Sequence, residues 1–504
     1  MNESALVNSL LQRVEQLGNK LPNPTILFIS LCGFILLISA LASWLGLSAV
    51  HPISGDTINS LNLLSKDGLH LILTHTVTNF THFAPVGSVL VAIMGIGVAE
   101  HSGLIAATLK ATILKAPKQL LSFFVVLASV LSSLAMDTGY VVLIPLAALV
   151  FIAAGRHPLS GIAAAFAGVS GGFSANILIG PVDAILAGIS TEAAALIQTD
   201  YQVNAAGNYY FLIVSTLVIS VVGTWVTEKI VEPRLGSYTK HHDSSVSTTL
   251  NSQEKSALRA VACFSLVFVG LLLSGLLPHN GLLRAEDNTI LGSPFIKGIV
   301  IIIAAYAAIA GYIYGKLSGS FAHKDDMIKG MESSISTMAG YIVLMFFAAQ
   351  FVSYFNWSQL GAIAAINGAE LLTSLSLSAA TLLVSFIVLA AIINLLIGSA
   401  SAKWALFAPI FIPMFLLLGI SPEATQMAFR IGDSTTNIIT PLMPYFGVVV
   451  AFVQRYDKEA GIGTIVATML PYSVAFLVSW SLLLLVWILL DWPLGPGAGI
   501  FITQ

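Results

Sequence analysis

Charged residues are scarce in this chain. Only 9% of its 504 residues are Asp, Glu, Lys or Arg, whereas 57% are hydrophobic. A soluble domain carries about 25% charged residues, so the composition excludes an ordinary soluble protein. The formal net charge of −3 gives no attraction to nucleic acid and excludes that class of partner. The sequence therefore predicts a protein whose surface faces lipid.

Cysteine and recognisable catalytic motifs are also scarce. The two cysteines, Cys32 and Cys263, both lie in apolar runs, which excludes a disulfide framework and a cysteine metal site. The chain has no HExxH zinc motif and no Walker loop, so we expect neither a zinc hydrolase nor an ATP-driven pump. We expect no enzyme activity and no bound cofactor.

Apolar runs of about 20 residues, the length that crosses a bilayer core, recur along the chain. They predict an all-α polytopic membrane protein with about nine transmembrane helices and two re-entrant hairpins. Lysine and arginine clusters mark cytoplasmic loops and place the N-terminus in the cytoplasm and the C-terminus in the periplasm. The predicted spans are 25–48, 83–105, 159–190, 210–228, 257–277, 295–315, 333–356, 423–452 and 465–490.

Two further apolar stretches are too long for one helix and return to the side from which they entered. Polar or glycine-rich residues interrupt both of these hairpins, 119–153 and 378–418, and also the spans that follow them, 159–190 and 423–452. A short amphipathic helix is expected at 357–375, on the outer surface. The predicted division is a cytoplasmic segment 1–24, a first repeat 25–228, a cytoplasmic linker 229–256, a second repeat 257–492 and a tail 493–504.

A gapless shift of 264 positions (409 − 145) superposes the first hairpin and broken span on the second. It matches Pro145 with Pro409, Phe151 with Phe415, Gly155 with Gly419, Pro158 with Pro422, Gly168 with Gly432 and Ser170 with Ser434. The two copies start on opposite sides of the membrane, so they form an inverted repeat. Matched breaks of this kind indicate a transporter's binding site, because unpaired backbone at membrane depth needs a protein-lined cavity. The alternative is that glycine and serine only allow close helix packing.

Ionisable and amide side chains inside spans are costly and therefore functional candidates. Arg430, Asp433 and Asn437 recur at helical spacing in the second broken span. Arg430 suits a carboxylate, and Asp433 and Asn437 offer oxygen ligands for Na⁺. The alternative is that Arg430 and Asp433 neutralise each other. Asn394, one turn before the second hairpin's break, is a further Na⁺ ligand or a helix–helix hydrogen bond.

Other polar residues lie near the remaining breaks. Trp404 follows the second hairpin's break, where it can stack on an aromatic ring or anchor at the interface. Lys403 either snorkels or contacts an anion, and the sequence does not decide between them. Asp183 takes a proton or a substrate donor, or is a solvated residue near the outer surface. Asp137, at the tip of the first hairpin, is a candidate cation ligand.

The chain resembles the AbgT family, the p-aminobenzoyl-glutamate transporters. The likeness covers nearly the whole chain in matching order and spacing. It is carried by GRHPLSGIAAAFAGVSGGFSANILI at 155–179, GISTEAAA at 188–195, IVEPRLG at 230–236, SPFIKGI at 293–299, AQFVSYFNWS at 349–358, LFAPIFIPMFLLLG at 406–419 and LGPGAGI at 494–500.

This resemblance implies a bowl-shaped homodimer in the bacterial inner membrane, with nine spans and two hairpins per protomer. It implies cation-coupled uptake of p-aminobenzoyl-glutamate, with Na⁺ or H⁺ as coupling ion, or proton-driven efflux of sulfonamide antimetabolites. The family's substrate-cavity residues fall on Asp183, Trp404, Pro422 and Arg430, and its sodium ligands on Asn394 and Asp433. The family pattern gives no role for Asp137.

Two functions from other classes remain as rivals. A passive channel needs a continuous polar pore, whereas the polar residues here concentrate at two matched breaks. An intramembrane enzyme needs a nucleophile beside a base, and no histidine lies within a helical turn of Ser133 or Ser399. The sequence leaves open the exact substrate, the direction of transport and the coupling stoichiometry.

Overall fold

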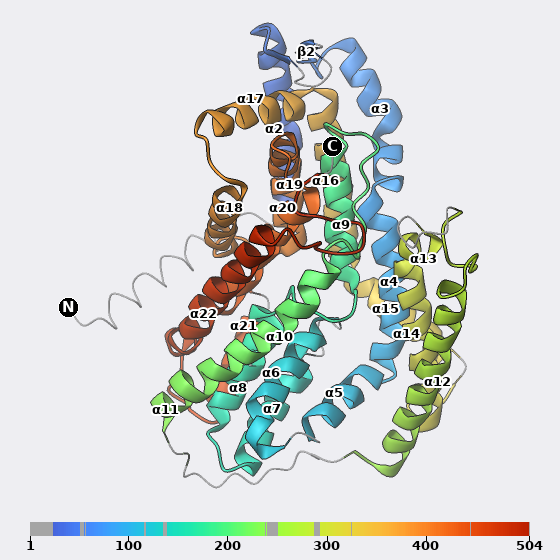
Figure 1. The fold of residues 1–504 in the computed structure, drawn as a ribbon, viewed down its shortest axis with the longest axis vertical. Helices are drawn as coiled ribbons and strands as arrows, with labels where there is room; N and C mark the ends of the chain where they lie inside the picture. The colour runs from blue at the N-terminus through green and yellow to red at the C-terminus, as the bar shows by residue number, and fades with distance from the viewer. Residues whose placement is uncertain are drawn as a thin grey trace, which may run out of the picture.

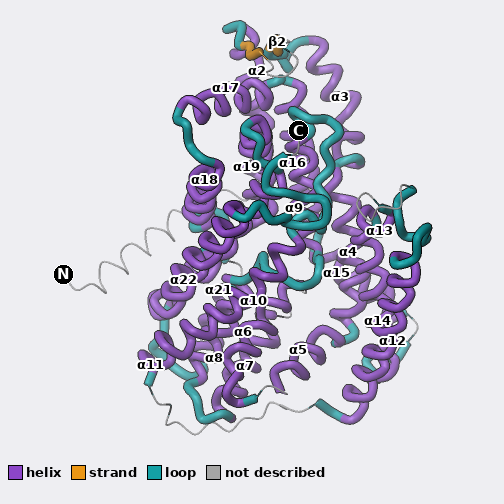
Figure 2. The backbone as a smooth tube through the Cα atoms, viewed as in Figure 1, coloured by secondary structure: helices purple, strands orange, loops and turns teal. Residues whose placement is uncertain are grey.

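The computed structural model is an elongated, almost wholly helical molecule (Figures 1 and 2). The sheet in its described part is a two-stranded antiparallel ribbon of β1 (Ser48–Val50) and β2 (Thr57–Asn59), at one end of the molecule. The all-α prediction is confirmed apart from this ribbon. The structure describes residues 24–50, 55, 57–114, 117–134, 139–236, 238, 250–286, 293–323, 325–443 and 445–502.

Within the described residues, seven helices are long and apolar enough to cross a bilayer, or nine if each of two bent pairs is one span. The broken spans fall outside that test because each is divided into short helices. That test also counts arms of the second hairpin, such as Ala400–Leu417. When each broken span is counted once and the hairpin arms are left out, the helices give the predicted nine spans and two hairpins. The predicted N-terminal segment 1–24 lies outside the described residues except for Pro24.

The first two spans are joined by more structure than the sequence indicated. After α2 (Pro24–Trp44) and the ribbon comes α3 (Lys66–Thr81), in a polar stretch for which no helix was predicted. Ser65 caps α3 by accepting a hydrogen bond from the Gly68 backbone N–H, a common start signal for a helix. The second span is divided into α4 (Ala84–His101) and α5 (Leu104–Leu114), which meet at 63°.

The first hairpin is followed directly by the first broken span. Two helical arms form the hairpin, and residues 135–138 at its tip, including Asp137, lie outside the described residues. The elements from the hairpin to the end of the fourth span are η1 (Lys118–Leu120), α6 (Leu121–Leu131), η2 (Ser132–Leu134), η3 (Gly139–Leu143), α7 (Ile144–Ala153), α8 (Pro158–Phe166), η4 (Ala167–Gly171), α9 (Pro181–Ala194), α10 (Tyr209–Val226), η5 (Thr227–Val231) and α11 (Glu232–Leu235).

The second half repeats this order after three further spans. A surface helix at one end of the molecule matches the predicted amphipathic segment (Figure 1). The elements are α12 (Ser252–Leu276), α13 (Pro294–Lys297), α14 (Ile299–Ser318), α15 (Asp326–Thr337), α16 (Ala339–Trp357), α17 (Leu360–Ser374), α18 (Ala379–Asn394), α19 (Ala400–Leu417), α20 (Pro422–Thr435), η6 (Asn437–Ile439), α21 (Phe446–Gln454) and α22 (Ile462–Leu489).

A glycine at the same repeat position sets the packing of hairpin on broken span in both halves. A Cβ on Gly432 of α20 would lie 2.4 Å from the Ile387 carbonyl oxygen of α18. A Cβ on Gly168, its repeat partner in η4, would lie 2.6 Å from the Val126 carbonyl oxygen of α6. Only glycine allows backbones to approach this closely inside a membrane protein. The inverted repeat read from the sequence is therefore also a repeat of helix packing.

Candidate functional site

The broken first span places a carboxylate in the middle of the molecule. After η4 the chain runs without a helix from residue 172 to 180 and then starts α9 at Pro181. Asp183 lies in the first turn of α9, and its Oδ2 accepts a hydrogen bond from the Gly180 backbone N–H at 2.7 Å. A carboxylate is favourable at a helix N-terminus. Asp183 is 3% exposed, so it is not a solvated residue near the outer surface.

Arg430 of α20 reaches across to this carboxylate. Its Nη1 lies 2.7 Å from Asp183 Oδ1, and its Nη2 donates a hydrogen bond to the Ser174 carbonyl at 2.9 Å. Both partners of Arg430 belong to the broken span of the first repeat. The predicted alternative, neutralisation of Arg430 by Asp433, does not occur in this structure. The break of one repeat is instead tied to the helix of the other by a buried ion pair.

The ion pair keeps unused hydrogen-bonding capacity. Arg430 Nε is buried without a hydrogen-bond partner, and Asp183 Oδ1 contacts Arg430 outside hydrogen-bond geometry. Buried polar atoms in native proteins are almost always hydrogen-bonded. A ligand with both a carboxylate and a donor group can satisfy these two atoms, which marks the pair as a candidate binding site.

A second buried ion pair lies on α18, α19 and α20. Lys403 Nζ lies 2.5 Å from Asp433 Oδ1 and donates to Asn394 Oδ1. Asn394 in turn donates through Nδ2 to the Asp433 carbonyl at 2.5 Å and to Asn437 Oδ1 at 2.9 Å. The structure thus brings the three predicted sodium ligands, Asn394, Asp433 and Asn437, into one network. Their side-chain oxygens face nitrogen donors. Of the two alternatives for Lys403, it contacts an anion, the Asp433 carboxylate, and does not snorkel.

Trp404 and Pro422, the other two predicted substrate residues, lie on α19 and at the start of α20. Trp404 is fully buried, donates to Ser190 Oγ at 3.0 Å and stacks on Phe429 at 4.6 Å between ring centroids. It is therefore not an interfacial anchor. Pro422 is the first residue of α20, so it lies about 12 Å along the helix from Arg430 at 1.5 Å rise per residue.

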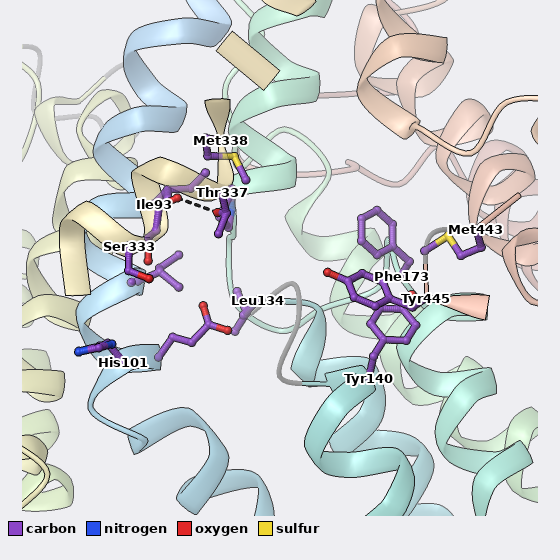
Figure 3. A pocket seen from close by; sticks show the side chains of 15 residues that line it. Ile93, His101, Leu134, Tyr140, Phe173, Ser333, Thr337, Met338, Met443 and Tyr445 are labelled. Carbon is purple, nitrogen blue, oxygen red and sulfur yellow. Dashed lines mark hydrogen bonds between the residues drawn. The ribbon is translucent and has the colours of Figure 1, made fainter. Parts of the chain in front are cut away.

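A cavity of about 450 Å³ reaches the start of α9 (Figure 3). On one side lie Phe173, Tyr140 and Tyr445, the last two stacked at 4.3 Å. On the other side lie His101 of α4, Ser333 of α15 and Met338, together with further residues of these two helices. Sequence reasoning missed this lining. Adjacent ionisable residues near the end of the second span, Glu100 and His101, were the available signal.

A second cavity, of about 770 Å³, lies beside the same helix. It is lined by Ala184, Gly188 and Thr191 of α9, by residues around Ile296 and Lys297, and by the C-terminal tail. Pro181 lines the first cavity and Ala184 the second. Asp183, which lies between these two residues in the sequence, belongs to the same turn of α9.

The break at 168–172 spells G-x-S-x-G, the letters of a hydrolase nucleophile elbow. That elbow needs a sharp strand-to-helix turn that exposes the serine. Here the residues form the π-helical turn η4, and Ser170 is fully buried. The described residues also contain no cluster of three or more His, Cys, Asp or Glu that could hold a metal ion. The break therefore supplies irregular backbone rather than a catalytic serine.

Residues 9–502 of the chain match the AbgT family of transporters. Over 485 residues the chain is 39% identical to the p-aminobenzoyl-glutamate transport protein of Escherichia coli (strain K12), which covers 96% of this chain and 95% of that protein. The match thus covers nearly the full length of both chains.

Two solved structures share the fold. The YdaH transporter of Alcanivorax borkumensis, noted for an unusual topology, has a TM-score of 0.91 and 51% identity, covering 94% of this chain and 100% of that chain. MtrF of Neisseria gonorrhoeae, whose structure illuminates a class of antimetabolite efflux pumps, has a TM-score of 0.92 and 46% identity, covering 97% and 100%. The chain is a multi-pass membrane protein that belongs to the AbgT transporter family.

Proposed function

We propose that this protein is a cation-coupled secondary transporter of p-aminobenzoyl-glutamate across the bacterial inner membrane. The observation that carries the proposal is the buried Asp183–Arg430 pair, which joins the broken spans of the two inverted repeats. A site at the interface of inverted repeats is where transporters bind their substrates. The 39% identical Escherichia coli protein supplies the substrate name.

The chemistry of the substrate fits the pair. p-Aminobenzoyl-glutamate carries two carboxylates and an aromatic amine. Arg430 binds a carboxylate through its planar fork, and Asp183 accepts the amine. Arg430 thereby exchanges the Asp183 carboxylate for a substrate carboxylate, whereas Asp183 exchanges the guanidinium for the neutral N–H donors of the aromatic amine. Trp404 shapes the site by packing against α9 and α20, and Pro422 fixes the start of α20.

Alternating access follows from the two cavities. Movement of the hairpin-bearing part against the remaining helices would connect Asp183 first with one cavity and then with the other. Coupling to Na⁺ or H⁺ supplies about 2.3 kcal/mol per charge for each 100 mV of membrane potential. We further propose a homodimer with a cytoplasmic N-terminus and a periplasmic C-terminus, as the lysine and arginine distribution favours.

Efflux of antimetabolites is the second candidate. It is favoured by the 46% identity and TM-score of 0.92 to the Neisseria gonorrhoeae protein. A sulfonamide carries an aromatic amine but no glutamate, so it would use Asp183 more than Arg430. The two functions therefore differ in which member of the pair they need.

Binding of labelled p-aminobenzoyl-glutamate to the purified protein tests the proposal. Arg430→Gln removes a charge-assisted contact of about 1.5–3 kcal/mol, so we expect Kd to rise roughly 10- to 100-fold. Arg455→Gln, the same change at an exposed arginine, should leave Kd unchanged. Equal affinity of wild type and Arg430→Gln would remove Arg430 from the site. If sulfonamide binding is measured in the same way, a loss of affinity in Asp183→Asn but not in Arg430→Gln would favour efflux.

A further inference from the structure

We infer that the cation site of the second repeat holds the chain's own Lys403 ammonium in place of a sodium ion. The ammonium contacts Asp433 Oδ1 and Asn394 Oδ1, which are two of the oxygens expected to bind sodium. The third, Asn437 Oδ1, accepts a hydrogen bond from Asn394 Nδ2. All three residues and Lys403 are buried. The oxygen cage is built, and a fixed positive charge fills it.

The surrounding helices make this place attractive to a cation. Helix α18 ends at Asn394 and α20 ends at Thr435, so two helix C-termini converge there. Helix C-termini carry partial negative charge and favour cations. The Asp433 carbonyl, in the last turn of α20, accepts a hydrogen bond from Asn394. The fold thus concentrates negative potential on the point that the ammonium reaches.

Lys403 itself comes from the unfavourable end of a helix. Ser399 caps α19, and Lys403 follows within the first turn or so of that helix. A positive charge near a helix N-terminus is repelled by the helix dipole. Lys403 Nζ is nonetheless buried against the oxygens of the other two helices. The contacts with Asp433 and Asn394 therefore determine where this side chain lies.

Sodium and the ammonium exclude each other from the cage. Sodium needs several oxygen ligands at once, and Lys403 contacts Asn394 Oδ1 and Asp433 Oδ1 already. Two positive charges a few ångströms apart in a buried site also repel strongly. Sodium fits only when Lys403 leaves the cage. This conclusion concerns the cage alone and does not depend on the identity of the transported substrate.

The first repeat shows that the lysine and its ligands belong together. Under the shift of 264 positions (409 − 145), the first copy has small or apolar residues at all four equivalent places, which are Val130, Gly139, Val169 and Phe173. Gly139 and Val169 are neighbours in space, because a Cβ on Gly139 would lie 3.0 Å from Val169 Cγ1. The first repeat therefore brings the equivalent positions together but has neither the cation nor the anion.

Thermal unfolding of the full-length protein in detergent tests this assignment, with sodium chloride replacing choline chloride at constant ionic strength. Wild type should have the same midpoint in both salts. Lys403→Met empties the cage, so sodium but not potassium should raise its midpoint by roughly 2–4 °C in a saturable way. Lys458→Met, the same change at an exposed lysine, should give no sodium response.

Two results would overturn the assignment. One is a saturable, sodium-specific rise in wild type that Asp433→Asn abolishes, because sodium would then bind beside Lys403. The other is a well-folded Lys403→Met protein without a sodium response. If Lys403→Met does not fold in choline, rescue by sodium alone supports the assignment. If sodium does not rescue Lys403→Met, although the double variant Lys403→Met with Asp433→Asn does fold, the assignment is contradicted.

Discussion

Arg430 and Asp183 place opposite charges where almost no side-chain surface is exposed. Burying an ion pair costs about as much as the attraction returns, and removing one partner alone costs about 3–5 kcal/mol. A hydrophobic pair of similar size would stabilise this position at least as well. These energetics agree with our proposal that a ligand exchanges with the members of the pair.

At this scale the sequence predicted the residues but not their partners. Helical spacing placed Arg430 and Asp433 on one face and suggested that they neutralise each other. In the structure each binds a distant residue, Asp183 and Lys403 respectively. Which of several buried charges meet depends on the packing of two repeats, which local spacing does not contain.

Replacing Trp404 with Phe should destabilise the protein more than its small change in size suggests. Phenylalanine keeps the stack on Phe429 but leaves Ser190 Oγ and the Leu186 carbonyl without their indole donor. We expect a loss of about 1–3 kcal/mol, measured as the change in free energy of unfolding in detergent. Trp225→Phe, at a half-exposed tryptophan, is the matched control. Equal losses in the two variants would contradict this role.

Among the elements, the close approach of α18 and α20 holds the Lys403 network together. Gly432→Ala would push its Cβ into the Ile387 carbonyl oxygen, 2.4 Å away. We expect overpacking to cost about 1–3 kcal/mol in unfolding experiments. Transport should fall with it, because Asp433 and Arg430 lie on the same helix. Gly447→Ala in α21, where nothing lies within 4 Å, should be nearly neutral.

The start of α8 makes stability depend on pH. His157 Nδ1 accepts a hydrogen bond from the Leu159 backbone N–H, which requires an unprotonated nitrogen. Burial lowers the pKa of His157 from its usual 6.5, and Glu232 and Asp457 only partly offset this. As pH falls below about 6.5, the unfolded chain therefore binds the proton before the folded chain does. The stability that His157 contributes is complete above that pH and is lost on acidification.

Asparagine caps a helix without titrating. His157→Asn should therefore keep the stability of wild type near neutral pH and reduce its loss below about pH 6.5. Thermal unfolding across that pH range measures both. His279→Asn, at an exposed histidine, should follow the wild-type curve. An unchanged acid loss in His157→Asn would assign the pH dependence to other groups.

Elements with local sequence signals were predicted well. Apolar runs gave the spans, and glycine and polar breaks gave both hairpins and both broken spans. The sequence did not reveal α3, because its polar composition resembles that of a loop. It did not reveal the bend between α4 and α5 either, because a single Ser102–Gly103 step resembles part of an ordinary helix. The backbone of α3 is helical although its sequence lacks a strong apolar stripe.

For the whole molecule, the repeat was legible in the sequence and the two cavities were not. A cavity is a property of surfaces from several helices, such as α4, α15 and the first hairpin around the 450 Å³ space. The approach of both cavities to α9, at Pro181 and at Ala184, emerges only when all of these helices are placed. Two separate cavities, rather than one continuous pore, favour a transporter over a channel.

The most direct test of the account is accumulation of labelled p-aminobenzoyl-glutamate in proteoliposomes, with an imposed sodium gradient, a proton gradient or neither. The account predicts saturable accumulation above equilibrium under one of the inward gradients, none without a gradient, and loss of accumulation in Arg430→Gln but not Arg455→Gln. Flux that does not saturate, needs no gradient and survives Arg430→Gln would contradict it and indicate a channel.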